Sequence, residues 1–376
     1  MFKTKKYYQQ QNIKAINFPT DIESIRKRIE DTDPILYGKT RNYGDGAVTY
    51  LSPYISRGVI STKQVYNYIM SLDLPWQKIE KLVQELAWRD YWQQVWLAKG
   101  DEIHTDLKNT QSDVFSHNIP KAIVEADTGI NVVDEAIKTL YTNGYMHNHM
   151  RMYVASICCN ISKCHWLTPA RWMYSHLLDG DLASNQLSWQ WVTGAFSNKK
   201  YYANQGNINK FFDSDQTGTF LDVDYSEFPS MEIPKKLEET VEFENSTKLP
   251  DTNKPELDRG KKTLVYNYYN LDPSWHKEKG YQRVLMLEPS VFEKYPVSEK
   301  NIDFVLNLAR NIEGIKVFVG EFNELEDLVS SDNIICKEHP LNKHYKGKEE
   351  TRDWISSVKG YHSSFFSYWK KAKKEL

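Results

Sequence analysis

The chain has 376 residues, of which 40% are hydrophobic and 26% charged, and its formal net charge is −2 at neutral pH. This length allows one large domain and a smaller one with buried cores, so disulfide staples are not needed. No run approaches the roughly 18 apolar residues of a membrane span, and residues 1–14 lack the apolar segment of a secretory signal. We therefore expect a soluble cytoplasmic protein.

Charge and aromatic residues are unevenly distributed along the chain. Residues 1–210 hold 24 Lys and Arg against 20 Asp and Glu, a surplus of four positive charges, whereas residues 211–376 hold 24 against 30. The 11 Trp and 24 Tyr are more than packing usually requires, and they concentrate before residue 210. Stacked bases or flat ring ligands are one explanation, and a bulky core is the other.

The four cysteines are Cys158, Cys159, Cys164 and Cys336. Their spacing suits neither a disulfide framework nor a zinc site, and we predict no metal. A reducing compartment agrees with this pattern.

The first 61 residues contain a predicted helix and a Gly-rich turn. Residues 1–36 are interpreted as a lead-in that ends in a helix over residues 21–30, with Thr20 as its cap. Residues 37–61 follow as a Gly-rich turn in which Thr49 and Ser52 are candidate phosphate ligands near a helix start. Most Gly-rich turns only connect elements, so this signal is weak alone.

Residues 76–97 are predicted to form a helix in which tryptophans recur at positions 88, 92 and 96. Such a stripe is usually core, and we assign Trp92 and Trp96 to it. Glu85, Trp88 and Arg89 fall within about one helical turn. A carboxylate could contact a base edge, an indole could stack on the base, and a guanidinium could hold a phosphate.

After an irregular stretch over residues 101–127, helical patterns return at 131–141, 146–163 and 169–178. Asn148, Arg151 and Met152 lie on neighbouring positions of one predicted helix, and the turn after the last pattern offers Asp179 and Asp181. Buried charges need partners. A routine Arg–Asp bridge in an aromatic-rich helical hairpin is the simpler reading of this region.

Residues 211–261 are acidic, rich in Pro, Ser and Thr, and typical of a linker. Candidate strands follow at 263–269, 283–289, 316–322 and 333–339, with helices expected at 297–311, 349–358 and the basic C-terminal tail. This alternation predicts a small parallel α/β unit.

Five motifs occur together in a fixed order: LSPY (51–54) after Tyr37, ELAWRD (85–90), MHNHMRM (146–152), DGDLASN (179–185) and WQW (189–191), followed by ANQGNINKF (203–211). Over about residues 35–212 they resemble the FAD-binding helical domain of the photolyase and cryptochrome family. The resemblance implies a mainly α fold with a lead-in at 1–36, the FAD domain at 37–212, a linker at 213–261 and a small α/β domain at 262–376.

The resemblance also implies residue roles. FAD is expected to be held by Tyr37, Thr49, Leu51, Ser52, Arg89, Asn148, Arg151, Asp179, Asp181 and Asn185. Arg151 is expected to pair with Asp179, and Asn185 to face flavin N5. Because an amide cannot supply a proton at neutral pH, Asn185 favours anionic reduced FAD, the form active in repair.

The resemblance also implies which residues bind the lesion and which transfer electrons. Trp88 and Trp191 match the pair that holds an extruded pyrimidine dimer, with Glu85, Asn148 and Met152 beside it. Trp189 and Trp166 match the first two members of an electron-transfer chain whose surface member we do not assign. We therefore expect a monomeric, blue-light-driven lyase that repairs cyclobutane pyrimidine dimers in UV-damaged DNA, with no membrane partner.

Two departures keep alternatives open. Tyr50 and His149 stand where arginine is common in the family, which favours a cryptochrome-like photoreceptor without repair, and a structural flavin-binding protein is a third alternative. The family's α/β antenna domain comes ahead of the helical domain, whereas here the α/β pattern follows it. Residues 263–376 are a candidate relocated equivalent, and whether they hold a second chromophore is left open.

Overall fold

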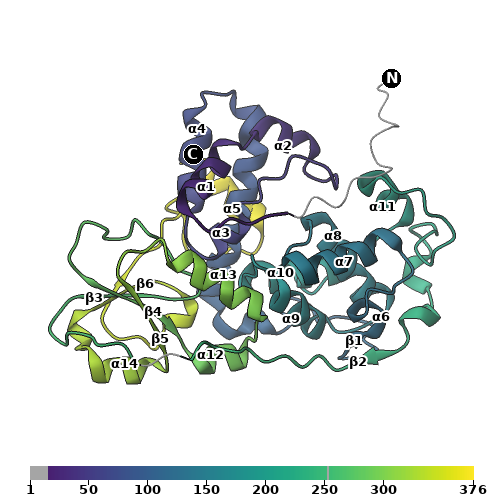
Figure 1. Cartoon of the computed structure of the whole chain (residues 1–376). Helices are drawn as coiled ribbons and strands as arrows, with labels where there is room; N and C mark the ends of the chain where they lie inside the picture. Colours follow the sequence, from purple (N-terminus) through teal and green to yellow (C-terminus); the bar gives the residue numbers. More distant parts are fainter. Residues whose placement is uncertain (1–15, 252–253) are drawn as a thin grey trace.

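The computed structural model describes residues 16–251 and 254–376, so residues 1–15 of the expected lead-in lie outside the described residues. Helices dominate the first part of the chain, and a parallel sheet forms on one side of the molecule from the last part (Figure 1). The first helices are α1 (Ile22–Glu30), α2 (Pro34–Thr40), α3 (Ser52–Ser56), α4 (Thr62–Ser71) and α5 (Trp76–Lys99).

Side-chain caps begin several of these helices. Asp21 caps α1 by accepting a hydrogen bond from Ser24 N at 2.8 Å, so the prediction that Thr20 is the cap is wrong by one residue. A carboxylate at this position also meets the positive end of the helix dipole, which explains the preference for Asp21. Ser61 and Gln64 form a capping box at the start of α4.

The long helix α5 confirms the prediction for residues 76–97 and extends it to Lys99. Trp92 and Trp96 are 6% and 1% exposed, as expected for core residues. Trp88, one turn earlier, is only partly buried. The tryptophan stripe therefore passes from the core to a less enclosed region.

A second group of helices follows a loop that contains only short helical pieces, as predicted. These pieces and helices are η1 (Gly100–His104), α6 (Lys121–Val124), α7 (Asn131–Asn143), α8 (Asn148–Ser156), α9 (Leu167–His176), α10 (Leu182–Thr193) and α11 (Gln205–Phe212). Helix α8 begins at Asn148 rather than Met146, because His147 acts as its N-cap and accepts a hydrogen bond from His149 N. It continues as a π-helical turn over Ile157–Ile161.

Between α11 and the sheet, the described residues have little regular structure. They contain the short turns η3 (Phe228–Ser230) and η4 (Lys235–Leu237) and the strand β2 (Thr240–Val241), which pairs antiparallel with β1 (Ile119–Pro120). This pairing ties the segment to the helical part.

The last part of the chain forms a five-stranded sheet in the order β5-β4-β3-β6-β7, with every neighbouring pair parallel. The strands are β3 (Thr263–Tyr266), β4 (Gln282–Leu287), β5 (Ile315–Val319), β6 (Ile334–Lys337) and β7 (Lys348–Glu350), and the helices are α12 (Pro289–Lys294), α13 (Glu299–Ala309), α14 (Phe322–Leu328) and α15 (Phe365–Ala372). The predicted parallel α/β unit is confirmed. The four candidate strands are present. The prediction of a helix over 349–358 is wrong, because the first residues of this range belong to strand β7, which pairs with β6.

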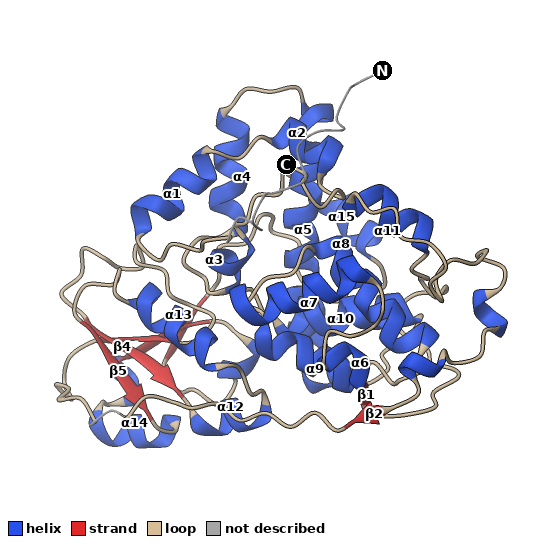
Figure 2. Cartoon of the chain, turned by 45° about the vertical axis from the view of Figure 1, so that its right-hand side comes forward, coloured by secondary structure: helices blue, strands red, loops and turns tan. Residues whose placement is uncertain are grey.

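Two large buried cores organise these elements, and a smaller one is formed by residues of the sheet such as Val265 and Phe318 with Phe322 of α14. One large core joins α1, α4 and α5 to residues of the sheet such as Leu264 and Tyr266 and to α15. The other large core lies among the helices between Ile119 and Leu237. The C-terminal helix α15 therefore packs on the N-terminal helix α5, although almost 270 residues separate their nearest ends in the sequence (Figure 2). Within the described residues, we find no helix that is both long and apolar enough to span a bilayer.

Candidate functional site

A cavity of about 600 Å³ lies among α2, α5, α8, α9 and α10, within the roughly 300–1,000 Å³ usual for small-molecule sites. Most of the site residues predicted from the sequence line it, and they come from separate segments of the chain. Those that line it are Tyr37, Thr49, Ser52, Glu85, Trp88, Arg89, Asn148, Arg151, Met152, Asp179, Asp181, Asn185, Trp189 and Trp191. Leu51 and Trp166 do not.

The expected ion pair between Arg151 and Asp179 is present in the wall of this cavity. Arg151 Nη2 donates to both carboxylate oxygens at 3.0 and 2.9 Å, and its Nε donates to Met146 O at 2.8 Å. The Asp179 side chain is 4% exposed. Burial raises the pKa of this carboxyl, but the charge of Arg151 and the hydroxyl of Ser52 more than offset it and hold the pKa below its usual value. The pair is therefore ionised at neutral pH.

Asp181 is fixed by three donors from two helices. Its Oδ1 accepts from Ser184 N at 2.7 Å and so caps α10, while Oδ2 accepts from Gln93 Nε2 at 2.5 Å. The guanidinium of Arg89 lies 4.0 Å from the same oxygen. The cap explains why α10 starts here, and it holds a carboxylate at the cavity wall.

Asn185 lies one turn into α10 and is 8% exposed. Its Nδ2 donates to Ala170 O at 2.8 Å. Because a carbonyl can only accept, this contact assigns the amide orientation and leaves Oδ1 as the atom that Asn185 can present to the cavity. The residue thus offers a neutral acceptor and no acid.

A buried hydroxyl shows that the cavity suits a polar ligand. Ser184 Oγ has no hydrogen-bond partner within residues 16–251 and 254–376, and Ser184 lines the cavity. Leaving such a group unpaired costs free energy, whereas a ligand with donors and acceptors would satisfy it. Together with the Arg151–Asp179 pair and Asn185, it makes a donor and acceptor set that fits a large polar cofactor such as FAD.

The two tryptophans expected to hold a lesion both line the cavity but differ in surroundings. Trp191 is 38% exposed. Trp88 stacks on Phe365 of α15 with ring centroids 3.8 Å apart and planes at 9°. One face of Trp88 is therefore covered by the C-terminal helix, and the sequence offered no signal for this contact.

Glu85 lies near the same part of the cavity with a side chain that is 33% exposed. Its Oε1 is 3.5 Å from Arg41 Nε and 3.6 Å from Lys81 Nζ. Arg41 also lines the cavity and was not singled out from the sequence. Tyr50, which lines the cavity too, has a backbone φ of +52°, a strained conformation for a bulky residue.

The remaining predicted residues lie behind the wall. Leu51 is 1% exposed and precedes α3, so it packs in the core beside Thr49, whose hydroxyl accepts from Leu51 N. Trp166 is fully buried and donates from Nε1 to Asp106 at 2.7 Å. Trp189 is 2% exposed and lines the cavity. The two tryptophans belong to the same core.

His147, the N-cap of α8, gives the stability of the fold a predicted pH dependence. Burial, with the neighbouring His149 and Arg151, lowers the pKa of His147 to about 4. In the unfolded chain histidine titrates near 6.5, so between these values the unfolded state binds more protons and stability falls as the pH drops. The difference corresponds to at most about 3 kcal/mol.

His147→Asn keeps a capping acceptor, and urea unfolding from pH 7 to 4 should show a smaller loss of stability than in the unsubstituted chain. An equal loss would contradict the shift.

Comparison with known proteins finds similarity in the helical part of the chain and in the segment that follows it. Residues 82–244 match the model of the FAD binding domain of DNA photolyase. A deoxyribodipyrimidine photo-lyase of Streptomyces griseus is 32% identical over 170 residues, which are 42% of this chain and 36% of that protein. Another from Alkalihalophilus pseudofirmus is 27% identical over 175 residues, 46% of this chain and 36% of that protein. The chain thus spans little more than a third of the length of these two relatives.

Cryptochromes are also similar to this chain. Cryptochrome-1 of Arabidopsis thaliana is 24% identical over 183 residues, which cover 45% of this chain and 27% of that protein. A solved cryptochrome of Synechocystis sp. aligns with a TM-score of 0.48 at 23% identity, over 53% of this chain and 44% of that one. The family-model match indicates an FAD-binding domain of the photolyase type over residues 82–244. Over this region the chain is similar to photolyases and to cryptochromes.

Proposed function

We propose that this protein is a light-driven DNA repair lyase that splits cyclobutane pyrimidine dimers with reduced FAD held in the large cavity. The observation that carries the proposal is that Glu85, Trp88 and Trp191 line the same cavity as the Arg151–Asp179 pair. This arrangement supports the proposal, because the groups proposed to bind the lesion and those proposed to bind the flavin come from distant parts of the sequence and line one cavity.

The flavin would be held by the polar wall. Arg151, Asp179 and Asp181 supply a rigid, charged frame, because each is fixed by hydrogen bonds before a ligand arrives. Asn185 Oδ1 is the acceptor available to a flavin N–H. Reduced FAD, when bound there, would supply the light-driven electron transfer that opens the ring of the dimer. Ser52 and Thr49 also line the cavity and are the groups proposed to hold the phosphates.

The lesion would enter by base flipping, the step by which photolyases bring a base out of the duplex and into the active site. Trp191 offers an exposed indole, and Trp88 offers the face that Phe365 does not cover. Stacking contributes about 1–3 kcal/mol per base, which helps to offset unstacking at a lesion that already stacks poorly. Glu85, Asn148 and Met152 are then in reach of the cavity that receives the bases.

Substitution of Trp191 tests the lesion site. Trp191→Ala should weaken binding of a dimer-containing oligonucleotide by about 1–3 kcal/mol, measured by fluorescence anisotropy. Phe115→Ala is the control, since Phe115 is 69% exposed and does not line the cavity. Equal affinities for both variants and the unsubstituted chain would remove Trp191 from the lesion site.

Substitution of Asn185 tests the flavin wall. Asn185→Leu removes the cavity acceptor and leaves Ala170 O without its donor, so FAD affinity should fall about tenfold or more. Titration of FAD against the quenching of its own fluorescence measures this change. Ser188→Ala is the matched control, because Ser188 lines the cavity but its side chain makes no hydrogen bond within the described residues. An equal affinity for both would argue against a role for Asn185.

A cryptochrome-like photoreceptor is the second candidate, favoured by the uncharged Tyr50 and by His149 at the cavity wall. His149 is tied to Asn42 O through Nδ1 at 3.0 Å, and burial lowers its pKa, so neutral His149 supplies no fixed positive charge for DNA phosphates. Illumination of the reduced protein with a dimer-containing oligonucleotide separates the two. Repair supports the lyase, whereas a light-dependent structural change without repair supports the photoreceptor.

Electron supply is proposed to run through Trp189 and Trp166. Trp189 lines the cavity, and both indoles are shielded from solvent. Trp189→Phe should abolish photoreduction of bound FAD, and unchanged photoreduction would assign the route to other residues, including the buried Trp172. Loss of photoreduction in this variant would also argue against a purely structural flavin.

We also propose that residues 37–212 form the FAD domain, 213–261 the linker and 262–376 a relocated equivalent of the family's antenna domain. The support is the all-parallel sheet with its first strand, β3, in the middle. An extra near-ultraviolet band in the absorption spectrum would reveal a second chromophore.

A further inference from the structure

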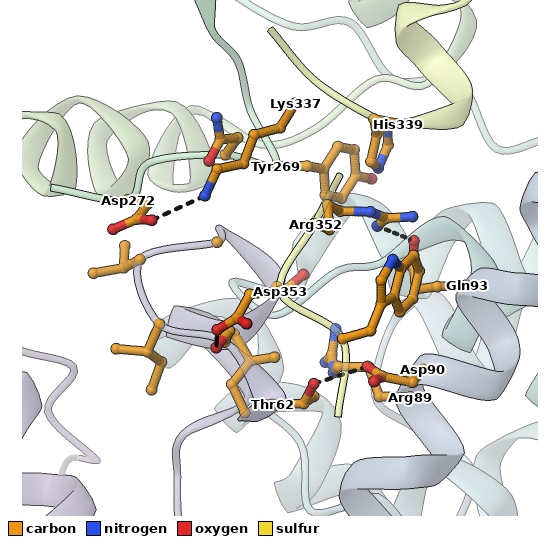
Figure 3. A pocket seen from close by; sticks show the side chains of 18 of the residues that line it. Thr62, Arg89, Asp90, Gln93, Tyr269, Asp272, Lys337, His339, Arg352 and Asp353 are labelled. Carbon is orange, nitrogen blue, oxygen red and sulfur yellow. Dashed lines mark hydrogen bonds and ion pairs between the residues drawn. The ribbon is translucent and has the colours of Figure 1, made fainter. Parts of the chain in front are cut away.

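A second, smaller cavity of about 110 Å³ lies where the ends of β3, β6 and β7 meet α5 and the segment before α4 (Figure 3). Its lining includes Asn270, Lys337, His339 and Arg352 from the α/β part, and Gln93 from α5. Asp181 lines both this cavity and the larger one. The small cavity is therefore a neighbour of the proposed flavin site with a separate set of donors.

The guanidinium of Arg352 has an unused edge in this cavity. Nη1 donates to Gln93 Oε1 at 2.7 Å, a contact drawn in Figure 3. Nε and Nη2 are buried and have no hydrogen-bond partner among the described residues. These two N–H groups lie side by side and form the fork that binds a carboxylate or phosphate in bidentate fashion.

No carboxylate of the described residues comes within ion-pair distance of this guanidinium. The acidic side chains around the cavity have other partners. Asp272 pairs with Lys337 at 2.9 Å, and Asp181 contacts Gln93 and Arg89. The remaining three accept hydrogen bonds: Asp90 from Thr62 and Ile355 N, Glu338 from Trp354 and Arg352 N, and Asp353 from Ser61. The guanidinium of Arg352 lies 4.4 Å from the ring centroid of Trp354, but that contact leaves the two buried N–H groups without an acceptor, which is costly.

Two further donors of the cavity lining are buried and unpaired. His339 is 5% exposed, and its Nδ1 accepts from Leu341 N, so the proton of the neutral ring lies on Nε2, which has no partner in the described part of the chain. Asn270 is 8% exposed, and its Nδ2 is likewise unpaired among those residues. His339 is held against Tyr269 with ring centroids 4.7 Å apart. Figure 3 shows His339, Tyr269 and the guanidinium of Arg352 on the same side of the cavity.

We propose that this cavity binds a small molecule through an oxyanion group, a carboxylate or a phosphate, held by the Nε–Nη2 edge of Arg352 and by His339 and Asn270. The cavity has room for such a group with a few further atoms. Bound ligand would also stiffen the chain of hydrogen bonds from Arg352 through Gln93 to Asp181, and so reach the wall of the larger cavity. The site itself does not depend on the proposed flavin chemistry.

Calorimetric titration of the full chain with inorganic phosphate, and separately with acetate, tests the proposal. We expect saturable binding of at least one anion, and the stronger of the two identifies the group that the site prefers. Arg352→Lys keeps a charge but loses the fork, so it should weaken binding about tenfold or more. Arg26→Gln is the matched control on an exposed arginine and should bind as the unsubstituted chain does.

A second variant keeps the test decisive if Arg352→Lys does not fold. His339→Phe preserves the ring stacked on Tyr269 but removes the Nε2 donor, and it should also weaken binding relative to Arg26→Gln. The proposal would be overturned if neither anion showed saturable binding, or if His339→Phe and the control bound equally well. Water would then be the partner of the unpaired N–H groups.

Discussion

Arg151→Leu should lower the free energy of unfolding by about 3–5 kcal/mol, measured by urea denaturation at pH 7. The substitution leaves the carboxylate of Asp179, whose side chain is 4% exposed, without its partner. It also removes the donor to Met146 O. FAD binding should be lost in parallel, because the charged frame of the cavity collapses.

Two comparisons show whether this effect comes from the buried pair. Arg26→Leu breaks the exposed pair with Glu23 and should cost at most about 1 kcal/mol. The double variant Arg151→Leu with Asp179→Leu removes both charges and should recover much of the stability lost in the single variant. A single-variant loss no larger than that of Arg26→Leu would contradict the account of the pair.

Phe365→Ala should cost about 3–5 kcal/mol of stability, because it opens a cavity between α15 and α5. Phe365 is 2% exposed, stacks on Trp88 at 3.8 Å and also contacts Tyr91 and Trp369. With its buttress gone, Trp88 gains rotamers, and affinity for a dimer-containing oligonucleotide should fall even at temperatures where the variant is folded.

The neighbouring residue provides the control. Phe366 is the next residue in α15 but is 68% exposed, so Phe366→Ala should change stability by no more than about 0.5 kcal/mol. Chemical denaturation of both variants, followed by anisotropy with the lesion oligonucleotide, measures the two effects. Unchanged lesion binding in folded Phe365→Ala would show that Trp88 needs no support from α15.

Local patterns in the sequence predicted much of the fold. Helix α5 follows from the spacing of its tryptophans, and the strands β3 to β6 follow from short apolar runs between turns. The predicted helix over 349–358 failed because Lys348–Glu350 is polar and its pairing with β6 is a long-range contact. Propensity alone does not reveal such a partner.

The candidate site shows the same division between local and long-range information. The Arg151–Asp179 pair could be predicted, because the resemblance to the photolyase and cryptochrome family implies it and because buried charges need partners. Phe365 on Trp88 and the unpaired edge of Arg352 could not, because each joins segments more than 250 residues apart. Such contacts depend on how the sheet docks on α5, which no short motif specifies. Ser184 lies within the DGDLASN motif (179–185), but only the structure shows that its hydroxyl is buried and has no hydrogen-bond partner among the described residues.

The central claim is that the large cavity holds FAD, and quantifying the flavin bound to the purified chain tests it most directly. After incubation with excess FAD and removal of the free cofactor, the absorption spectrum should show flavin bands that correspond to a single FAD per chain, and Arg151→Leu that remains folded should show far less. A chain that retains no flavin, or equal amounts in both proteins, would contradict the account.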